Sequence, residues 1–266
     1  MQYMILRRAD RQSETERPTA AESALLFAAL KPSESGVRVS LDTSLSNGEA
    51  TVTHGPFADT EHMIAGFAII DAPSKEGAVE WLRRWPESDH PVELEIRESG
   101  CHGGCAQVVA SDNAQPEGKR FAVLLRSSPA LEAEAHVPQH LLDRLDAHNA
   151  AEARNGVLLA ADGLRSSARG ARVKVAPGAF SVIDGPFTEI KEMIAGFWLI
   201  RVPTLEDAIA WATRNPYPTG PQVELEIRQL YDASDSIDAF TPDLQAAEQR
   251  MRAEQLEAGM RAHFTA

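Results

Sequence analysis

The stretch HGPFADTEHMIAGFAIIDAP (His54–Pro73) recurs 130 residues later as DGPFTEIKEMIAGFWLIRVP (Asp184–Pro203), and ten of the twenty positions are identical. The run VELEIR also occurs twice, at Val92–Arg97 and at Val223–Arg228. Self-similarity of this kind indicates a duplicated structural unit. We therefore predict a first, shortened repeat over residues 1–99, a linker over 100–118, a second repeat over 119–232 and a C-terminal helix over 240–264.

The second repeat predicts an α+β unit. The expected strands are residues 120–126, 171–175, 179–183, 193–202 and 223–228, with a turn at Pro177-Gly178. One helix is expected to begin at Pro138, to place Leu141, Leu145 and His148 on one face, and to end at Gly156; another follows the N-cap Thr204. This order indicates a ferredoxin-like unit with helices on one face of the sheet, so the other repeat should cover the opposite face.

The first repeat should keep this plan, with a strand at Gln2–Arg8 and a poorer, shorter helix over Pro18–Lys31. In the VELEIR strand of the second repeat, charged residues alternate with apolar ones. We expect the face that carries Glu226 and Arg228 to be solvated, as in a sheet with one wet side. On that expectation Arg228 is a poor candidate for binding a ligand.

Composition restricts the classes of partner. The 266 residues contain 26 Lys and Arg against 39 Asp and Glu, which gives a net charge of −13 and a pI near 5.1. An acidic protein is poorly suited to nucleic acid or to an anionic membrane. The sequence lacks the roughly 18 consecutive apolar residues of a spanning helix, and its first residues do not resemble a secretory signal. We therefore expect a cytoplasmic protein without nucleic-acid or membrane partners.

The motif spacing in the second repeat resembles the YCII-related family, specifically its DGPF branch. The matching residues are Asp184-Gly185-Pro186-Phe187, Glu189, Lys191-Glu192, Gly196-Phe197, Trp211-Ala212, Pro216 and Val223–Arg228. The resemblance implies ferredoxin-like units that pair sheet to sheet as a dimeric α+β barrel. A tandem copy would then form this barrel within one chain, as a monomer with an internal pseudo-dimer or as a weak homodimer.

The resemblance also implies a chemistry. Some YCII-like proteins act on small ring compounds such as chlorinated hydroquinones or lactone-type intermediates, and a His–Asp pair is proposed as their acid–base machinery. Here His140, in Pro138-Gln139-His140-Leu141, and Asp184 match that pair. A histidine titrates near neutral pH, and a neighbouring carboxylate would orient it. The alternative is that Asp184 only caps a turn and that His140 is solvated.

Four further residues are candidates for substrate binding. His148 lies on the predicted apolar face of its helix, where a core histidine is the plainer interpretation. His54 takes the place of Asp184 in the first repeat, either through drift of that copy or as part of a site shared between repeats. Arg126 and Arg172 could bind an anionic substrate if they point into the barrel.

The linker contains Cys101-His102-Gly103-Gly104-Cys105. Two thiolates and an imidazole could hold zinc with a fourth ligand such as His90 or Asp89, but this spacing lacks a second cysteine pair. A reversible disulfide and a flexible linker with two exposed cysteines are the alternatives. The sequence therefore leaves the role of this segment open.

The sequence leaves two functions open. The first is a cofactor-free acid–base enzyme of isomerase, lyase or dehydrohalogenase type, acting on a small cyclic or enolic compound. The second is a non-catalytic ligand- or protein-binding regulatory module, because DGPF relatives are associated with extracytoplasmic-function sigma factors. In that case the C-terminal helix would be the contact with a protein partner.

Overall fold

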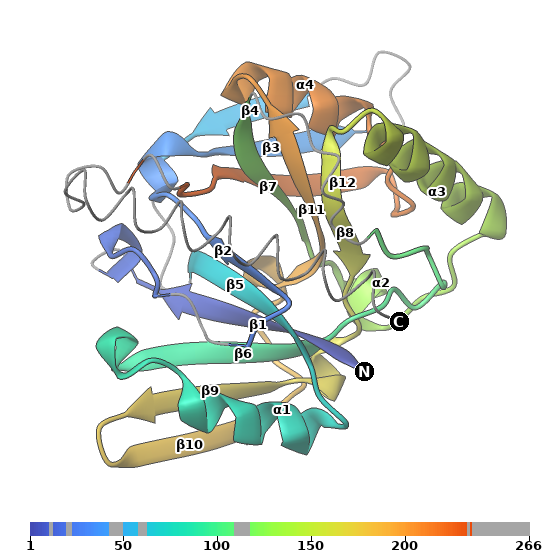
Figure 1. The fold of residues 1–266 in the computed structure, drawn as a ribbon. Coiled ribbons are helices and arrows are strands. Elements are labelled where there is room, and N and C mark those ends of the chain that lie inside the picture. The colour runs from blue at the N-terminus through green and yellow to red at the C-terminus, as the bar shows by residue number, and fades with distance from the viewer. Residues whose placement is uncertain are drawn as a thin grey trace, which may run out of the picture. The chain divides into compact units, whose positions relative to one another are not determined.

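Twelve strands form two six-stranded antiparallel sheets within Met1–Leu230 (Figure 1). This computed structural model describes residues 1–10, 13–19, 23–42, 50–57, 63–108, 118–232 and 235. The first sheet has the order β10 (Ala179–Asp184), β9 (Ala171–Ala176), β6 (Val92–Glu98), β1 (Gln2–Ala9), β5 (Met63–Asp71), β2 (Leu26–Ala29). The second has the order β4 (Ala50–His54), β3 (Val37–Asp42), β12 (Gln222–Gln229), β7 (Lys119–Arg126), β11 (Ile194–Val202), β8 (Leu158–Gly163).

Helices cover the outer faces of both sheets. The α-helices are α1 (Lys75–Trp81), α2 (Pro129–Glu132), α3 (Gln139–Arg154) and α4 (Leu205–Arg214); 3-10 turns lie at Ser13–Thr15, Ser33–Ser35, Leu82–Arg84, Glu87–Asp89, Ser167–Arg169 and Ile190–Glu192. Helix α1 packs on the first sheet, and α3 and α4 pack on the second (Figure 1). None of these helices is long and apolar enough to cross a membrane. The expected C-terminal helix lies outside the described residues.

The strand predictions are largely confirmed, and the helix predicted over Pro18–Lys31 is wrong. Leu26–Ala29 in that range is strand β2, which pairs with β5 from Leu26 opposite Ile69 to Ala29 opposite Gly66. Tertiary pairing with an apolar neighbouring strand overrides the moderate helix propensity of this Leu- and Ala-rich stretch.

Apolar side chains from both repeats fill the space between the sheets. Phe67 of β5 and Phe197 of β11 occupy equivalent positions in the two repeats, and their ring centroids are 5.1 Å apart. Single bridges also join the sheets, from Leu30 to Leu230 and from Ser99 to Leu164. The face of each sheet opposite the helices is therefore covered by the other sheet, as the amphipathic strands require.

The repeats exchange a hairpin, which the sequence analysis did not predict. Strands β3 and β4 come from the first repeat, yet β3 pairs with β12 of the second. Reciprocally, β9 and β10 of the second repeat extend the first sheet through β6. Because β6 and β12 carry the same VELEIR sequence, each can accept the hairpin of either copy. Each sheet therefore contains four strands of one repeat and two of the other.

The charged face of VELEIR is buried at this junction, so the expectation of a solvated face is wrong. Glu226 and Arg228 are 3% and 0% exposed. The Glu226 carboxylate lies 2.6 Å from Nη2 of Arg126, 3.0 Å from Nη1 of Arg228 and 3.4 Å from Nε of Arg38. Arg38 belongs to the exchanged strand β3. A buried charge is tolerated only when it is paired, and here one of the three partners, Arg38, comes from the other repeat.

The first sheet repeats this arrangement around Glu95. Its carboxylate lies 3.1 Å from Nε of Arg172, which is on the exchanged strand β9, and 3.3 Å from Nη1 of Arg97. Arg8 contributes a third guanidinium at 3.8 Å. The two centres are thus equivalent, each with one glutamate among three arginines from both repeats.

The glycine of the repeated HGPF and DGPF motifs is required by close backbone contact. A Cβ at Gly185 would lie 1.9 Å from the Ser167 carbonyl oxygen, and one at Gly55 would lie 1.8 Å from that of Ser33. These serines are held in turn, because Ser167 N donates to Glu132 (2.7 Å) and Ser33 N donates to Glu14 (2.9 Å). At least this part of the motif is therefore structural.

We expect Glu226→Ala to lower the free energy of unfolding by about 3–5 kcal/mol, because it leaves buried guanidinium groups without their carboxylate. Glu224→Ala is the matched control, since Glu224 lies on the same strand and face but is exposed; it should change stability by less than about 0.5 kcal/mol. Urea unfolding measures both. Equal losses in the two variants would contradict the assigned role of Glu226.

We expect Gly185→Ala to destabilise the protein by about 1–3 kcal/mol, because the added methyl group overlaps a backbone carbonyl that is itself held. Gly220→Ala is the control, because no atom lies within 4 Å of a Cβ there. Its stability should change by less than about 1 kcal/mol. Thermal unfolding of both variants tests this, and an undisturbed Gly185→Ala protein would show that the contact is not constrained.

Candidate functional site

The structure does not bring His140 and Asp184 together. His140 is exposed in the first turn of α3, on the outer face of the second sheet. Asp184 ends β10 in the first sheet, is 69% exposed, and accepts a hydrogen bond from Lys75 Nζ at 2.6 Å. Figure 1 shows α3 and β10 well apart, and no hydrogen bond or ion pair joins these two described side chains. The acid–base pair stays a prediction without geometric support.

His148 packs against helix α4. Its ring centroid lies 5.8 Å from that of Trp211, and burial lowers the pKa of His148 below its ordinary value. The buried face of α3 consists of Leu142, Leu145 and Asn149, one position beyond the predicted Leu141 and His148. A desolvated neutral ring against tryptophan fits a packing role better than a binding role.

His54 and Arg126 do lie together, in a groove of about 340 Å³ that Arg38 also lines. Although burial acts in the opposite direction, Arg126, Arg228 and Arg38 hold the pKa of Glu226 below its usual range. The guanidinium of Arg38 also stacks on Phe57, 4.2 Å from the ring centroid. The main role of these arginines is therefore to neutralise a buried carboxylate.

Arg172 has the corresponding role at the other end of the structure. It pairs with Glu95 and, at 3.1 Å, with Glu189 of the segment that follows DGPF. Its guanidinium stacks on Phe187, again 4.2 Å from the ring centroid. The predicted ligand-binding residues Arg126 and Arg172 thus belong one to each of the two glutamate–arginine centres.

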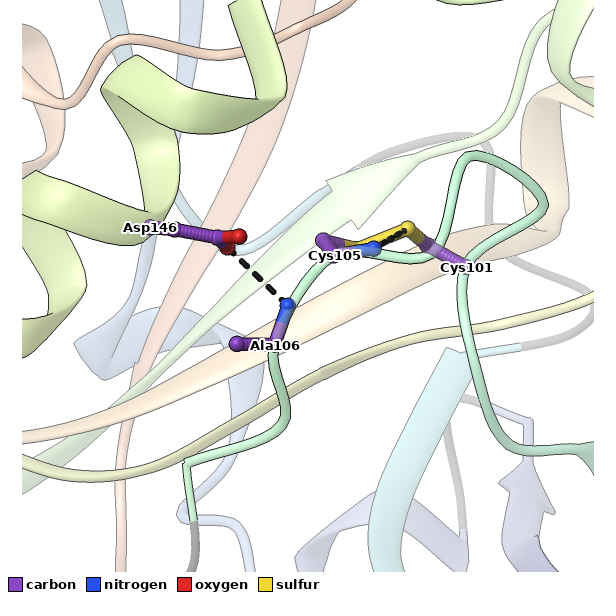
Figure 2. The surroundings of a disulfide bond; sticks show 4 residues. All are labelled: Cys101, Cys105, Ala106 and Asp146. Atoms are coloured by element: carbon purple, nitrogen blue, oxygen red, sulfur yellow. Dashed lines mark hydrogen bonds between the residues drawn. A yellow bond between two sulfur atoms is a disulfide. The ribbon is translucent and has the colours of Figure 1, made fainter. Parts of the chain in front are cut away.

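The linker cysteines form a disulfide between Cys101 and Cys105 (Figure 2). Of the alternatives that the sequence left open, the structure shows this one. The proposed fourth metal ligand Asp89 instead binds Arg7 Nε at 2.8 Å and Trp85 Nε1 at 2.8 Å. Among the described residues no cluster of three or more His, Cys, Asp or Glu could hold a metal ion.

The disulfide segment covers a cavity of about 80 Å³ between α3 and the edge of the second sheet. Most of its lining is apolar, including Leu142 and Leu145 of α3 and Trp198 of β11. The polar exceptions include Asn149, whose Oδ1 accepts a hydrogen bond from Trp198 Nε1 at 3.1 Å. A mostly apolar pocket with a few polar groups is the usual form of a small-molecule site.

Asp162 is one of three ionisable residues that line this cavity, with His102 and Glu134. It lies near the end of the apolar strand β8, and its Oδ2 accepts a hydrogen bond from Gln107 Nε2 at 3.0 Å. Burial raises the pKa of Asp162 to about 6, although the backbone amides of Gly163 and Gly100 partly oppose this rise. A carboxyl group that titrates near neutral pH can both donate and accept protons.

The sequence analysis missed Asp162. The available signal was an acidic residue directly after the apolar run Val157–Ala161, followed by Gly163. Nothing in that pattern showed that the linker, about 60 residues earlier in the sequence, would lie beside the carboxylate and bind it through Gln107. The segment also carries His102, whose Nδ1 lies 3.3 Å from Glu134 Oε2 at the cavity wall.

The sequence model of the YCII-related domain matches residues 1–98 and again residues 120–230. The chain belongs to the YCII-related family. It carries two copies of the domain, in agreement with the internal repeat. A search of curated proteins finds no significant match.

The two YCII-related domains differ at the cavity. Leu125 lines it, and the equivalent residue of the first domain is Arg7, because these residues pair with Gly196 and Gly66, respectively. Arg7 fills the corresponding place with a buried ion pair to Asp89, at 2.7 Å from Nη2. Where the first domain has Asp89, the second domain has Tyr-Pro-Thr-Gly-Pro at residues 217–221, which contains no carboxylate. Within the part of the chain that the structure describes, only the second domain, with Asp162, therefore offers this candidate site.

We expect the Asp162 carboxyl carbon to titrate in NMR with a midpoint near pH 6 rather than near 3.8. The Asp162→Asn variant identifies the resonance by its loss. A midpoint close to 4 would show that water reaches the carboxylate freely.

Stability should follow the same titration. Because the folded state binds the proton more tightly than the unfolded state, stabilisation by Asp162 is present below about pH 4 and is lost as pH rises to about 6. The effect should be at most about 3 kcal/mol. The difference between the unfolding curves of the protein and of Asp162→Asn across this window measures it, and a parallel pH dependence would contradict it.

Proposed function

We propose that this YCII-related protein is an acid–base enzyme of isomerase, lyase or dehydrohalogenase type, acting on a small cyclic or enolic compound in the Asp162 cavity. The observation that supports this is a carboxyl group whose pKa is raised to about 6 by burial, in a residue that lines a mostly apolar cavity. Carboxyl groups tuned in this way serve as general acids or bases near neutral pH.

The proposed reaction begins with removal of a proton from carbon next to a carbonyl or enol group. The C–H bond breaks, the proton passes to the Asp162 carboxylate, and the electron pair moves to the substrate oxygen as an enolate. The Thr219 hydroxyl lines the cavity and is buried without a hydrogen-bond partner among the described residues. We assign it the donor to this oxygen. Return of the proton to another carbon gives isomerisation, and departure of a leaving group gives elimination.

The size of the cavity limits the substrate. About 80 Å³ is roughly half the 150 Å³ of a cavity that holds benzene. Only a small compound fits the closed form, and a substituted ring requires displacement of a wall. The wall with the least support is the segment that carries Cys101–Cys105, because it is a linker rather than part of a six-stranded sheet.

We further propose that the two domains form an intrachain dimeric α+β barrel of the DGPF branch. The bridges Leu30–Leu230 and Ser99–Leu164 support closure of the two sheets on each other at both edges. Hydrogen bonds from Lys31 N to Gln229 O (2.8 Å) and from Arg165 N to Glu98 O (3.0 Å) extend these junctions. The DGPF motif at residues 184–187 supports the assignment to the branch.

The proposed function predicts that the protein catalyses exchange of hydrogen for deuterium next to the carbonyl group of small cyclic compounds. A panel of five- and six-membered cyclic ketones and lactones tests this class of substrates. NMR in D₂O reports enzyme-dependent loss of the proton next to the carbonyl. We expect Asp162→Asn to lower this rate at least about 100-fold, the usual range for a general acid or base. Asp143→Asn is the matched control, because Asp143 lies on the exposed face of α3 and binds Gln139.

Other outcomes would contradict the proposal in different ways. Loss of exchange in His140→Gln and Asp184→Asn, with Asp162→Asn active, would assign catalysis to the pair implied by the family resemblance. Binding of panel compounds without exchange would instead favour a non-catalytic ligand-binding module. If the protein neither binds the panel compounds nor catalyses their exchange, this substrate class is excluded.

A further inference from the structure

We propose that the Cys101–Cys105 disulfide is a reversible redox latch on the Asp162 cavity, opened by a dithiol reductant. The closed segment over the cavity is residues 100–108, which we call the roof. The consequence for catalysis rests on the proposed function, whereas the latch itself depends only on the contacts of the roof.

The position of the disulfide argues against a global structural role. It joins cysteines only four residues apart, within the linker, and connects neither the two domains nor two sheets. Closing so short a loop removes much less entropy from the unfolded chain than closing a long one. Its effect is therefore concentrated on the conformation of the roof.

The ring of residues 101–105 lies between two anchors that meet at β8. Before the ring, Gly100 N donates to Gly163 O at 2.9 Å. After it, Gln107 Nε2 donates to Asp162 at 3.0 Å, and Val108 pairs with Ala161. The disulfide thus limits the distance between the contact of Gly100 with β8 and the contacts of Gln107 and Val108 with β8.

The ring also fits closely against helix α3. Ala106 N donates to Asp146 Oδ1 at 3.0 Å, as Figure 2 shows. A Cβ at Gly103 would lie 2.7 Å from Leu142 Cδ1, a residue of the cavity wall. Movement of the ring must therefore alter the cavity itself.

A reductant can reach the disulfide. Both cysteines are half-buried, and their neighbours His102 and Gly104 are exposed. One thiolate of a dithiol attacks a cysteine sulfur, which breaks the Cys101–Cys105 bond and forms a mixed disulfide. The second thiol of the reductant then closes its own disulfide and releases the protein. Two electrons reach the cysteines, and the two thiol protons of the reductant end on Cys101 and Cys105.

Amide hydrogen exchange tests the latch without a substrate. Dithiothreitol should reduce the folded protein, with a mass gain of two hydrogens after removal of the reductant under acid. In the reduced protein, and in Cys101→Ser/Cys105→Ser without reductant, we expect exchange at Gly100, Ala106 and Val108 to accelerate at least about tenfold. Reoxidised protein is the matched control, and amides in the central strand β7 should not change.

Unchanged exchange at these three amides, in both the reduced protein and the double variant, would overturn the proposal. So would a disulfide that dithiothreitol reduces only when β7 unfolds. These measurements are independent of turnover, so a latch that opens in a protein inactive toward the panel would contradict the proposed function alone. Turnover at Asp162 with a roof insensitive to reduction would contradict the latch alone.

Discussion

Each exchanged hairpin meets its new sheet at a buried carboxylate, Glu226 in one sheet and Glu95 in the other. Glu226 of the second repeat pairs with Arg38 of the first, and Glu95 of the first pairs with Arg172 of the second, beside arginines of their own repeats. Charges at such depth are costly unless they are paired. Both sheets place the polar face of VELEIR toward the interior, where these ion pairs join each exchanged strand to the strand that accepts it. We regard them as devices for specificity rather than sources of large net stability.

Duplication of the YCII-related domain allows one copy to change while the other keeps the interior paired. The central pair Phe67–Phe197 and the two glutamate–arginine centres preserve the twofold pattern. The outer faces have diverged. Where Arg7 and Asp89 form a buried pair in the first domain, Leu125 and the 217–221 segment leave room for a cavity in the second. Loss of a charged pair on one outer face does not disturb the shared interior.

The linker joins the repeats and also supplies the environment of Asp162. The carboxylate itself belongs to a regular strand, whereas several of its hydrogen-bond partners come from residues 99–107 of the linker. The site therefore combines Asp162, which is fixed in strand β8, with a linker segment that is held by few contacts. Segments of this kind lie at the low-stability end of a structure, which is where conformational control is usually found.

The sequence alone determined the duplication, the α+β class and most strand positions, because repeated motifs and apolar runs are local properties. It also identified the Cys101–Cys105 segment, while leaving its chemistry open. Local patterns could not show that Leu26–Ala29 joins a sheet, that the hairpins exchange, or that Glu226 and Arg228 are buried, because alternation of polar and apolar residues does not say what covers the polar face. Only the tertiary structure separated His140 from Asp184 and enclosed Asp162, since burial, and with it the pKa of a carboxyl group, is created by residues distant in sequence.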